Sequence, residues 1–282
     1  MIRQLREESF EVKESCLTLG ASRSGYYQHL KDSRCARAKD NDRLRSEVHQ
    51  VFWDHRRRYG ARRISRELIA EGHRCSRAKA RKIMSQMALV SIQPRSFKPR
   101  TTQSRHRLGY SPNLLLSGVE LEAINRVWVG DITYVPLRNR FAYLALLMDL
   151  YSRRIVGWGL ELHMEESLVI GALRMSIRNR QPGPELIHHT DRGGQYAARE
   201  YRRILTRARM LQSMSRADDC YDNAFMESCF GRLKAELEMT SYASIDDAAR
   251  EIPEYINYYN FKRRHSSLDY VSPNSFESSS LP

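Results

Sequence analysis

The sequence lacks an apolar run of the roughly 18 residues that a membrane-spanning helix needs. Its first residues, MIRQLREESFEVKE, are charged and lack the apolar core of a secretory signal. It has five cysteines but no CxxC pair, so a zinc finger is not expected even though His49 and His55 have a finger-like spacing. We therefore expect a soluble intracellular protein with no membrane partner, whose thiols are reduced and mostly buried.

Positive charge is concentrated in the first part of the chain. The whole sequence has 47 Lys and Arg and 33 Asp and Glu, a formal net charge of +14. Residues 1–110 hold 26 of the basic and 11 of the acidic residues, a net charge of +15, whereas residues 111–282 hold 21 and 22, a net charge of −1. An excess confined to one part favours a polyanionic partner, DNA or RNA first, over a merely solvated basic surface.

Two pairs of short helices are expected within this basic part. In the first, over residues 1–35, Gly20 can end one helix and Ser22 can cap the next. In the second, over residues 40–93, ARRISRELIAEG and SRAKARKIMSQM follow a longer helix, NDRLRSEVHQVFWDHRRR, and resemble a helix-turn-helix. Helical pairs also occur in proteins that never bind DNA, but the last helix here has four basic side chains that we expect to contact DNA: Arg77, Lys79, Arg81 and Lys82.

A basic linker is expected over residues 94–118. Most of it, PRSFKPRTTQSRHRLGYSPN, has no hydrophobic period and is rich in Pro, Arg, Ser and Thr. It could lie along a DNA backbone or serve only as a solvated tether.

An α/β domain is predicted over residues 119–282. Three apolar runs, RVWVGDITYVPL, FAYLALLMDLYS and RIVGWGLEL, predict an antiparallel meander. Helical and strand-like segments then alternate, and the last helix, IDDAAREIPEYINYYNFKRRH, contains Pro253 as a candidate kink. The order βββαβαβα predicts a mixed sheet flanked by helices.

Three acidic side chains in this domain are candidates for a metal site. Asp131 lies within the apolar run WVGDITYV, Asp191 ends the strand ELIHHTD, and Glu227 projects off the core stripe of its helix. Carboxylates in apolar surroundings are expensive to bury unless they are paired or bind a metal, and Mg²⁺ prefers oxygen ligands. A solvated edge residue, a turn cap and a helix-surface glutamate are equally good interpretations of the three, so the pattern alone does not select them from 33 acidic residues.

The blocks WVGDITYV, HTDRGGQY and YDNAFMESCFGRLKAE resemble the catalytic blocks of bacterial insertion-sequence transposases. Specifically, they resemble the downstream-frame protein of the insertion-sequence-three family, whose core is similar to that of retroviral integrases. The 35 residues between Asp191 and Glu227 match the family's spacing, and RYGARRI and YNFKRRHSSLDYVSP are also similar to family blocks. The resemblance covers about residues 10–275 and is specific when its motifs are taken together.

The resemblance implies an RNase H-like core in which Asp131, Asp191 and Glu227 are catalytic and bind two Mg²⁺ or Mn²⁺ ions. It implies a DNA transposase that cleaves element ends and transfers them into target DNA, acting as a homo-oligomer on double-stranded DNA. An upstream-frame protein or fused segment is a further expected partner, and the bacterial cytoplasm, at the nucleoid, is the expected location. Two other hypotheses are a non-catalytic DNA-binding regulator and an RNase H-like nuclease that cuts without joining.

Four further residues are expected to contact DNA. Asn223 shares a helix face with Glu227, so it could orient the glutamate, touch DNA or cap the helix. Lys234 lies two turns after Glu227, where integrases have a lysine that contacts the DNA end; the alternative is a solvated lysine. Arg263 and Arg264 are expected phosphate contacts, or else a solvated helix end.

Three other polar residues are expected to have structural roles. The resemblance makes Asp149 a structural residue, although a fourth metal ligand is the alternative. His188 and His189 are expected to pack within a strand, because hard Mg²⁺ prefers oxygen to imidazole nitrogen.

Overall fold

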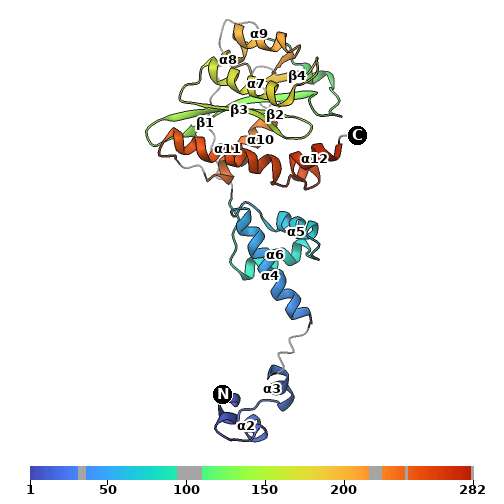
Figure 1. The fold of residues 1–282 in the computed structure, drawn as a ribbon, viewed down its shortest axis with the longest axis vertical. Coiled ribbons are helices and arrows are strands. Elements are labelled where there is room, and N and C mark those ends of the chain that lie inside the picture. Colours follow the sequence, from blue (N-terminus) through green and yellow to red (C-terminus); the bar gives the residue numbers. More distant parts are fainter. Residues whose placement is uncertain (31–35, 94–109, 216–223, 239–240, 281–282) are drawn as a thin grey trace. The chain divides into compact units, whose positions relative to one another are not determined.

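The computed structural model divides into two compact units, residues 1–91 and 92–282. Each unit has its own hydrophobic core. No helix in the part of the chain that the structure describes is both long and apolar enough to cross a membrane. The described residues, drawn in colour in Figure 1, are 1–30, 36–93, 110–215, 224–238 and 241–280.

The first unit is helical in its described residues. Gly20 follows its second helix and Gly72 its fifth, both with the positive φ that favours glycine. Ser22 and Ser76 cap the helices that come next, each accepting a hydrogen bond from a backbone N–H in the first turn. The helix boundary predicted at Gly20 and Ser22 is therefore confirmed. The helices are α1 (Ile2–Glu7), α2 (Val12–Thr18), α3 (Arg23–Leu30), α4 (Ala36–Asp54), α5 (Ala61–Ala70) and α6 (Arg77–Gln86).

Helices α4, α5 and α6 enclose one core. From α4, four side chains are buried in it: Leu44, Val48, Val51 and Phe52. From α5, Ile64 and Leu68 join them, whereas Ile69 is 51% exposed. The core residues from α6 are Ala80, Ile83 and Met84, so the basic residues between them are left on the outer face of that helix.

The second unit is built on a five-stranded mixed sheet in the order β3-β2-β1-β4-β5. The first three strands form the predicted antiparallel meander, and β4 and β5 add in parallel beyond β1. The predicted mixed sheet is confirmed. The strands are β1 (Val127–Pro136), β2 (Phe141–Asp149), β3 (Ile155–Glu161), β4 (Ile187–Thr190) and β5 (Leu211–Met214).

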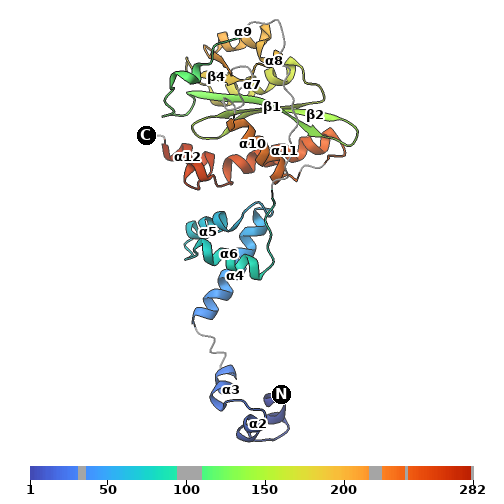
Figure 2. The same cartoon turned by 180° about the vertical axis from the view of Figure 1, so that it is seen from behind.

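Helices cover both faces of this sheet, as Figures 1 and 2 show. One face packs on α7 (Glu166–Arg180), α8 (Gly194–Ala197) and α9 (Arg199–Arg207), and the other on α10 (Ala224–Glu236) and α11 (Ile245–Phe261). Helix α12 (Pro273–Ser280) follows and contacts α11. Pro253 lies inside α11, which continues through it as one helix.

The end of the expected linker belongs to the second unit. A short 3-10 helix, Leu114–Ser117, lies against β4 and β5. The backbone N–H of Leu114 donates to Ser213 Oγ at 2.9 Å. The rest of the expected linker, residues 94–109, lies outside the described residues.

Two glycines in β3 allow α7 to pack unusually close to the sheet. A Cβ built on Gly157 would lie 2.0 Å from Ser176 Oγ and 2.4 Å from the Ala172 carbonyl oxygen. A Cβ on Gly159 would lie 2.8 Å from the Leu168 carbonyl oxygen. Because two of these atoms are backbone, any side chain here would push the helix away from the strand.

Gly157→Ala is expected to lower the free energy of unfolding by about 1–3 kcal/mol, because overpacking forces the helix and strand apart. Gly171→Ala is the matched control on α7, because nothing lies within 4 Å of its added Cβ. The control should stabilise the protein by about 0.5–1 kcal/mol, as alanine favours helix over glycine. Urea unfolding measures both changes, and equal unfolding midpoints for the two variants would contradict this packing.

A buried ion pair fixes α10 to the segment after α11. Arg263 Nη2 lies 2.5 Å from Glu236 Oε1, and the two side chains are 1% and 9% exposed. Tyr255 on α11 also donates to Glu236, at 3.0 Å. Arg263 was expected to contact a phosphate, but the structure places it in the interior because Glu236 compensates its charge there. That expectation is therefore corrected to a structural role.

Arg263→Met is expected to destabilise the protein by about 3–5 kcal/mol, because it leaves the Glu236 carboxylate buried without its cation. The double variant Glu236→Gln/Arg263→Met removes both charges and keeps an acceptor for Tyr255, so it should be markedly more stable than the single variant. Thermal unfolding compares the three proteins. A double variant that is less stable than Arg263→Met would show that the pair's charges are not what matters.

Candidate active site

The register of two parallel strands brings Asp131 and Asp191 together. In β1 and β4, Val129 pairs with His189. Asp131 and Asp191 each lie two residues further along, just beyond the last pair of this ladder. Paired residues of parallel strands point to the same face of a sheet. For β1 this is the face that Val129 shares with the core beneath α10 and α11.

A tight turn after β4 orients the Asp191 carboxylate. Its Oδ1 atom accepts a hydrogen bond from the backbone N–H of Gly193, at 2.9 Å. A Cβ at Gly193 would lie only 3.0 Å from that oxygen. Glycine therefore leaves open the space beside the carboxylate. This is an Asx-type turn, in which a side chain bonds to its own backbone two residues on.

Helix α10 carries Glu227 toward the same place. Its Met226, Phe230 and Leu233 are buried against the sheet, and Glu227 lies in the first turn with its side chain exposed. The core contacts thus fix the helix, while the glutamate remains accessible from outside. The negative charge of Glu227 contributes to the raised pKa of Asp131, so the two carboxylates lie within electrostatic range of each other.

The three carboxylates form one electrostatic cluster. The pKa of Asp131 is raised well above its ordinary value, first by burial and then by the negative charge of Asp191, with Glu227 adding to it. A backbone hydrogen bond from Ile132 and the charge of Lys234 act in the opposite direction. Like charges held this close favour a bound proton or a cation, which would relieve their repulsion.

Tyr196 lies within electrostatic range of this cluster, and the sequence did not reveal it. It lies in α8, is 1% exposed, and belongs to the core under α7 and α9. Its pKa is raised well above the ordinary value by burial and by the charges of Asp131 and Asp191. Its ring belongs to the block HTDRGGQY, but a tyrosine in such a block is equally typical of ordinary packing.

Lys234 also lies at the cluster, as its predicted position two turns after Glu227 requires. Its Nζ atom is 4.1 Å from the centroid of the Tyr134 ring. Burial lowers the pKa of the lysine, and the charge of Asp131 raises it in part. Sequence spacing placed Lys234 on the correct face but gave no sign of Tyr134.

The donor chemistry of the cluster fits a divalent ion that prefers oxygen. Mg²⁺ and Mn²⁺ take carboxylate ligands and keep several waters, so three carboxylates are a sufficient protein contribution. In the described part of the chain, the ligand atoms of Asp131, Asp191 and Glu227 do not all lie within 4.8 Å of one another. They would have to draw closer to share one ion.

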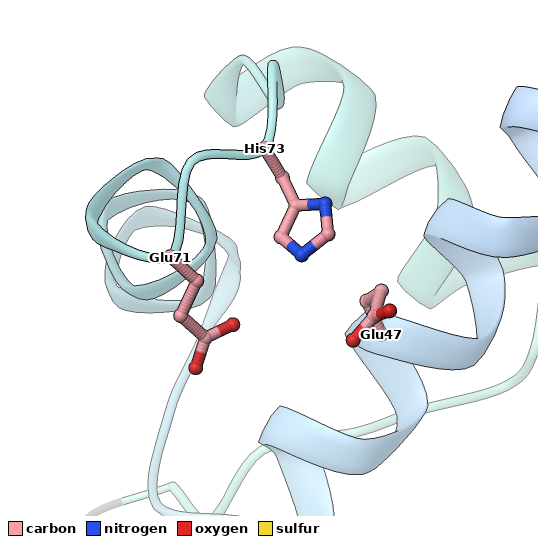
Figure 3. Close-up of side chains that lie close together, drawn as sticks. All are labelled: Glu47, Glu71 and His73. Carbon is pink, nitrogen blue, oxygen red and sulfur yellow. The ribbon is translucent and has the colours of Figure 1, made fainter.

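A second cluster, in the first unit, meets that distance condition. The side chains of Glu47, Glu71 and His73 point toward one another in Figure 3, and their ligand atoms lie within 4.8 Å of one another. However, Glu71 is exposed, and Glu47 lies 4.0 Å from Arg43. Exposed carboxylates that already have cationic neighbours do not need a metal, so we assign none here.

The three residues expected to be structural have that role. Asp149 is buried, and its carboxylate accepts hydrogen bonds from the backbone of Asn125, Tyr151 and Ser152. The two histidines are buried in β4. His188 bonds to Tyr201 Oη at 2.7 Å, and His189 to Ser213 Oγ at 2.8 Å.

The expected thiol chemistry is confirmed where the cysteines can be described. Cys16, Cys75 and Cys229 are free and buried. Burial raises the pKa of Cys229 to about 11, which keeps it a neutral thiol. Cys35 and Cys220 lie outside the described residues.

The expected DNA contacts differ in their accessibility. On α6, Arg77, Arg81 and Lys82 are exposed and line a shallow depression together with Ser85. Lys79 is less exposed, and its Nζ lies 3.6 Å from Asp40. These positions give α6 a basic outer face.

In the second unit, Arg264 is half-buried, and its guanidinium donates to the Tyr270 carbonyl oxygen at 2.8 Å. Asn223 lies outside the described residues. Of the basic contacts predicted in this unit, Lys234 is therefore the one that lies at the carboxylate cluster.

Comparison with known protein families divides the chain in the same way. A family described as an HTH-like domain matches residues 39–97. Two families, each described as an integrase core domain, match residues 122–220 and 208–273. Together they span the helical pair with α6 and the unit that holds the carboxylate cluster.

Several known proteins are similar over almost the whole chain. The 31 kDa protein of insertion element IS600 of Shigella sonnei is 39% identical over 263 residues, which are 93% of this chain and 96% of that protein. The transposase InsF for insertion sequence IS3A of Escherichia coli K12 is 34% identical over 281 residues, 98% of this chain and 96% of that one. Among solved structures, the HTLV-2 integrase catalytic core domain in complex with magnesium (trimeric form) matches with 16% identity and a TM-score of 0.44, covering 55% of this chain and 97% of that chain.

The identity to these relatives exceeds 30% over nearly their full length, and the matched domains coincide with the observed architecture. The sequence resemblance is therefore confirmed. The chain belongs to the IS3-family insertion-sequence transposases, DNA transposases that join a helix-turn-helix-like domain to an integrase core.

Proposed function

We propose that Asp131, Asp191 and Glu227 hold two Mg²⁺ or Mn²⁺ ions and that this site cleaves the ends of the element and transfers them into target DNA. The observation that supports the proposal most directly is the electrostatic cluster: Asp191, at the end of β4, and Glu227, on α10, both lie close enough to Asp131 on β1 to raise the pKa of its carboxylate. Such a like-charged group is costly without cations, and two-metal phosphoryl transfer uses such groups.

The protein's own part in the reaction is to position the carboxylates that hold the ions. When bound, the ions supply Lewis-acid stabilisation of the attacking and leaving oxygens of the phosphodiester. The strand register and the Gly193 turn fix the two aspartates, so little reorganisation is needed when DNA arrives. Glu227, exposed at the start of α10, closes the set from the solvent side.

DNA docking is proposed to rest mainly on the first unit. The exposed Arg77, Arg81 and Lys82, with Lys79 beside them, would bind phosphates or base edges, as the last helix of a helix-turn-helix does. Lys234 would contact a phosphate near the cut, and Arg264 would add a further backbone contact. Residues 111–282, which include the carboxylate cluster and have a net charge of −1, have less attraction for duplex DNA.

We propose further that the protein acts as a homo-oligomer on DNA, because the two ends of an element must be joined in one event. An upstream-frame protein or fused segment would supply additional contacts with the ends. We place this activity in the bacterial cytoplasm, at the nucleoid, because the relatives come from bacteria and the proposed substrate is their DNA.

Asp131→Asn, Asp191→Asn and Glu227→Gln are each expected to reduce cleavage of an element-end duplex by at least about 100-fold, because the ions supply several kcal/mol of transition-state stabilisation. Each substitution keeps the side-chain shape, so binding of the duplex should change little. Glu122→Gln is the matched control, an exposed carboxylate of the same unit. Gel analysis of the products in Mg²⁺ also separates joining from cutting alone. Any of the three variants that cleaves like the control has been wrongly assigned.

Arg77→Glu/Arg81→Glu is expected to weaken duplex binding and to make it less dependent on salt. The slope of log K against log salt should flatten by about 0.9 for each phosphate that the protein no longer neutralises. The control, Arg178→Glu/Arg207→Glu, changes the net charge equally at exposed positions of α7 and α9. Fluorescence anisotropy at several salt concentrations compares them. Equal weakening in the two double variants would show that net charge, and not α6, determines affinity.

A further inference from the structure

The ammonium group of Lys234 lies on an aromatic platform. Tyr134 is three residues after Asp131 in β1, and Lys234 is seven residues after Glu227 in α10, so their contact joins the two elements that carry catalytic carboxylates. The distance from Nζ to the ring centroid is 4.1 Å, well within the roughly 6 Å over which a ring face attracts a cation.

The Tyr134 ring also contacts a second aromatic ring. Phe141, at the start of β2, meets Tyr134 edge to face, with 5.3 Å between ring centroids and 73° between their planes. The two residues are diagonal neighbours across the ladder, in which Tyr134 pairs with Tyr143 and Pro136 with Phe141. The platform therefore belongs to the rigid sheet, and the mobile partner in the contact is the lysine.

A lysine side chain has four rotatable bonds, and an exposed one samples many positions at a cost in entropy whenever it is fixed. Contact with the ring restricts Lys234 before DNA arrives. Its ammonium carries three N–H donors, so contact with the ring face still leaves donors for an anion. The charge of Asp131 acts on the same ammonium, so it lies at the edge of the carboxylate cluster.

We propose that Tyr134 is a positioning residue for the transposition site: its ring holds the Lys234 ammonium beside the carboxylates, ready to bind a phosphate of the DNA end. The inference rests on the proposed function in taking Lys234 as a phosphate contact. It adds a residue whose part depends on its ring face and not on its hydroxyl.

A double-mutant cycle in the full chain tests the coupling without catalysis. The proteins are wild type, Tyr134→Leu, Lys234→Ala and the double variant, and the probe is a duplex ending in the element's terminal sequence, bound in Ca²⁺ so that chemistry does not interfere. Tyr134→Leu and Lys234→Ala should each weaken binding about 5-fold or more, which is the size of a partly desolvated cation–π contact. The double variant should bind no more weakly than Lys234→Ala. Independent, multiplying effects would overturn the proposal.

A conservative substitution at Tyr134 distinguishes a positioning role of its ring from a role in packing alone. Tyr134→Phe keeps the ring face, so it should bind the duplex within about 2-fold of wild type. Tyr151→Leu is the control, a tyrosine of the same unit that packs on Phe276 away from Lys234, and it should leave binding unchanged. If Tyr134→Leu does not fold, Tyr134→Met replaces it as a variant of similar length without a ring. Wild-type binding by a folded variant without the ring would overturn the proposal.

Cleavage by the same proteins in Mg²⁺ distinguishes this inference from the proposed function. Tyr134→Leu should need more DNA for half-maximal cleavage and should recover most of its maximal rate at saturation, since the carboxylates are intact. If Asp191→Asn cleaves normally while the binding cycle shows coupling, the proposed catalytic site fails and the positioning role stands. If Asp191→Asn is inactive and the cycle shows no coupling, the proposed catalytic site stands and the positioning role of Tyr134 fails.

Discussion

The parallel pairing of β1 with β4 is the constraint on which the rest of the site depends. It brings Asp131 and Asp191, each two residues beyond the pair Val129 and His189, to the same end of the sheet. The cost of that arrangement is visible in the raised pKa of Asp131, since burial and a neighbouring carboxylate both oppose its ionisation. The hydrogen bond from Gly193 to Asp191 and the positive charge of Lys234 reduce the cost of holding these carboxylates together. Helix α10 adds a third carboxylate, Glu227, to the site.

The carboxylate cluster and the basic surface expected to bind DNA lie in different parts of the chain. The excess of positive charge lies in residues 1–110, where the core of α4, α5 and α6 leaves basic side chains on the outer face of α6. In the second unit, two arginines instead compensate buried glutamates. Arg263 compensates Glu236 on α10, and Arg180 compensates Glu277 on α12, at 2.8 Å. A buried ion pair contributes little net stability, but separating its partners is costly. The pair of Glu236 with Arg263 therefore fixes the position of α10, the helix that carries Glu227.

Hydrophobic periodicity predicted most of the fold, because the meander, the helices and their Gly and Ser boundaries are local features. The three carboxylates that we propose to be catalytic could not be selected by pattern, and they were named through the resemblance of whole motifs. Arg263 was misplaced because its partner, Glu236, is 27 residues away in sequence and an arginine at a helix end normally reaches solvent. Tyr134 was missed for the same reason: the contact with Lys234 depends on how α10 packs against β1, which no local pattern encodes.

The central claim is that the three carboxylates form a site for divalent ions, and crystals of the full chain soaked in Mn²⁺ test it most directly. Anomalous scattering at the manganese edge locates the ions without relying on activity. The account predicts peaks bonded to Asp131, Asp191 and Glu227, with carboxylate oxygens as the protein ligands. Ions found only elsewhere, for example between Glu47, Glu71 and His73, would contradict it.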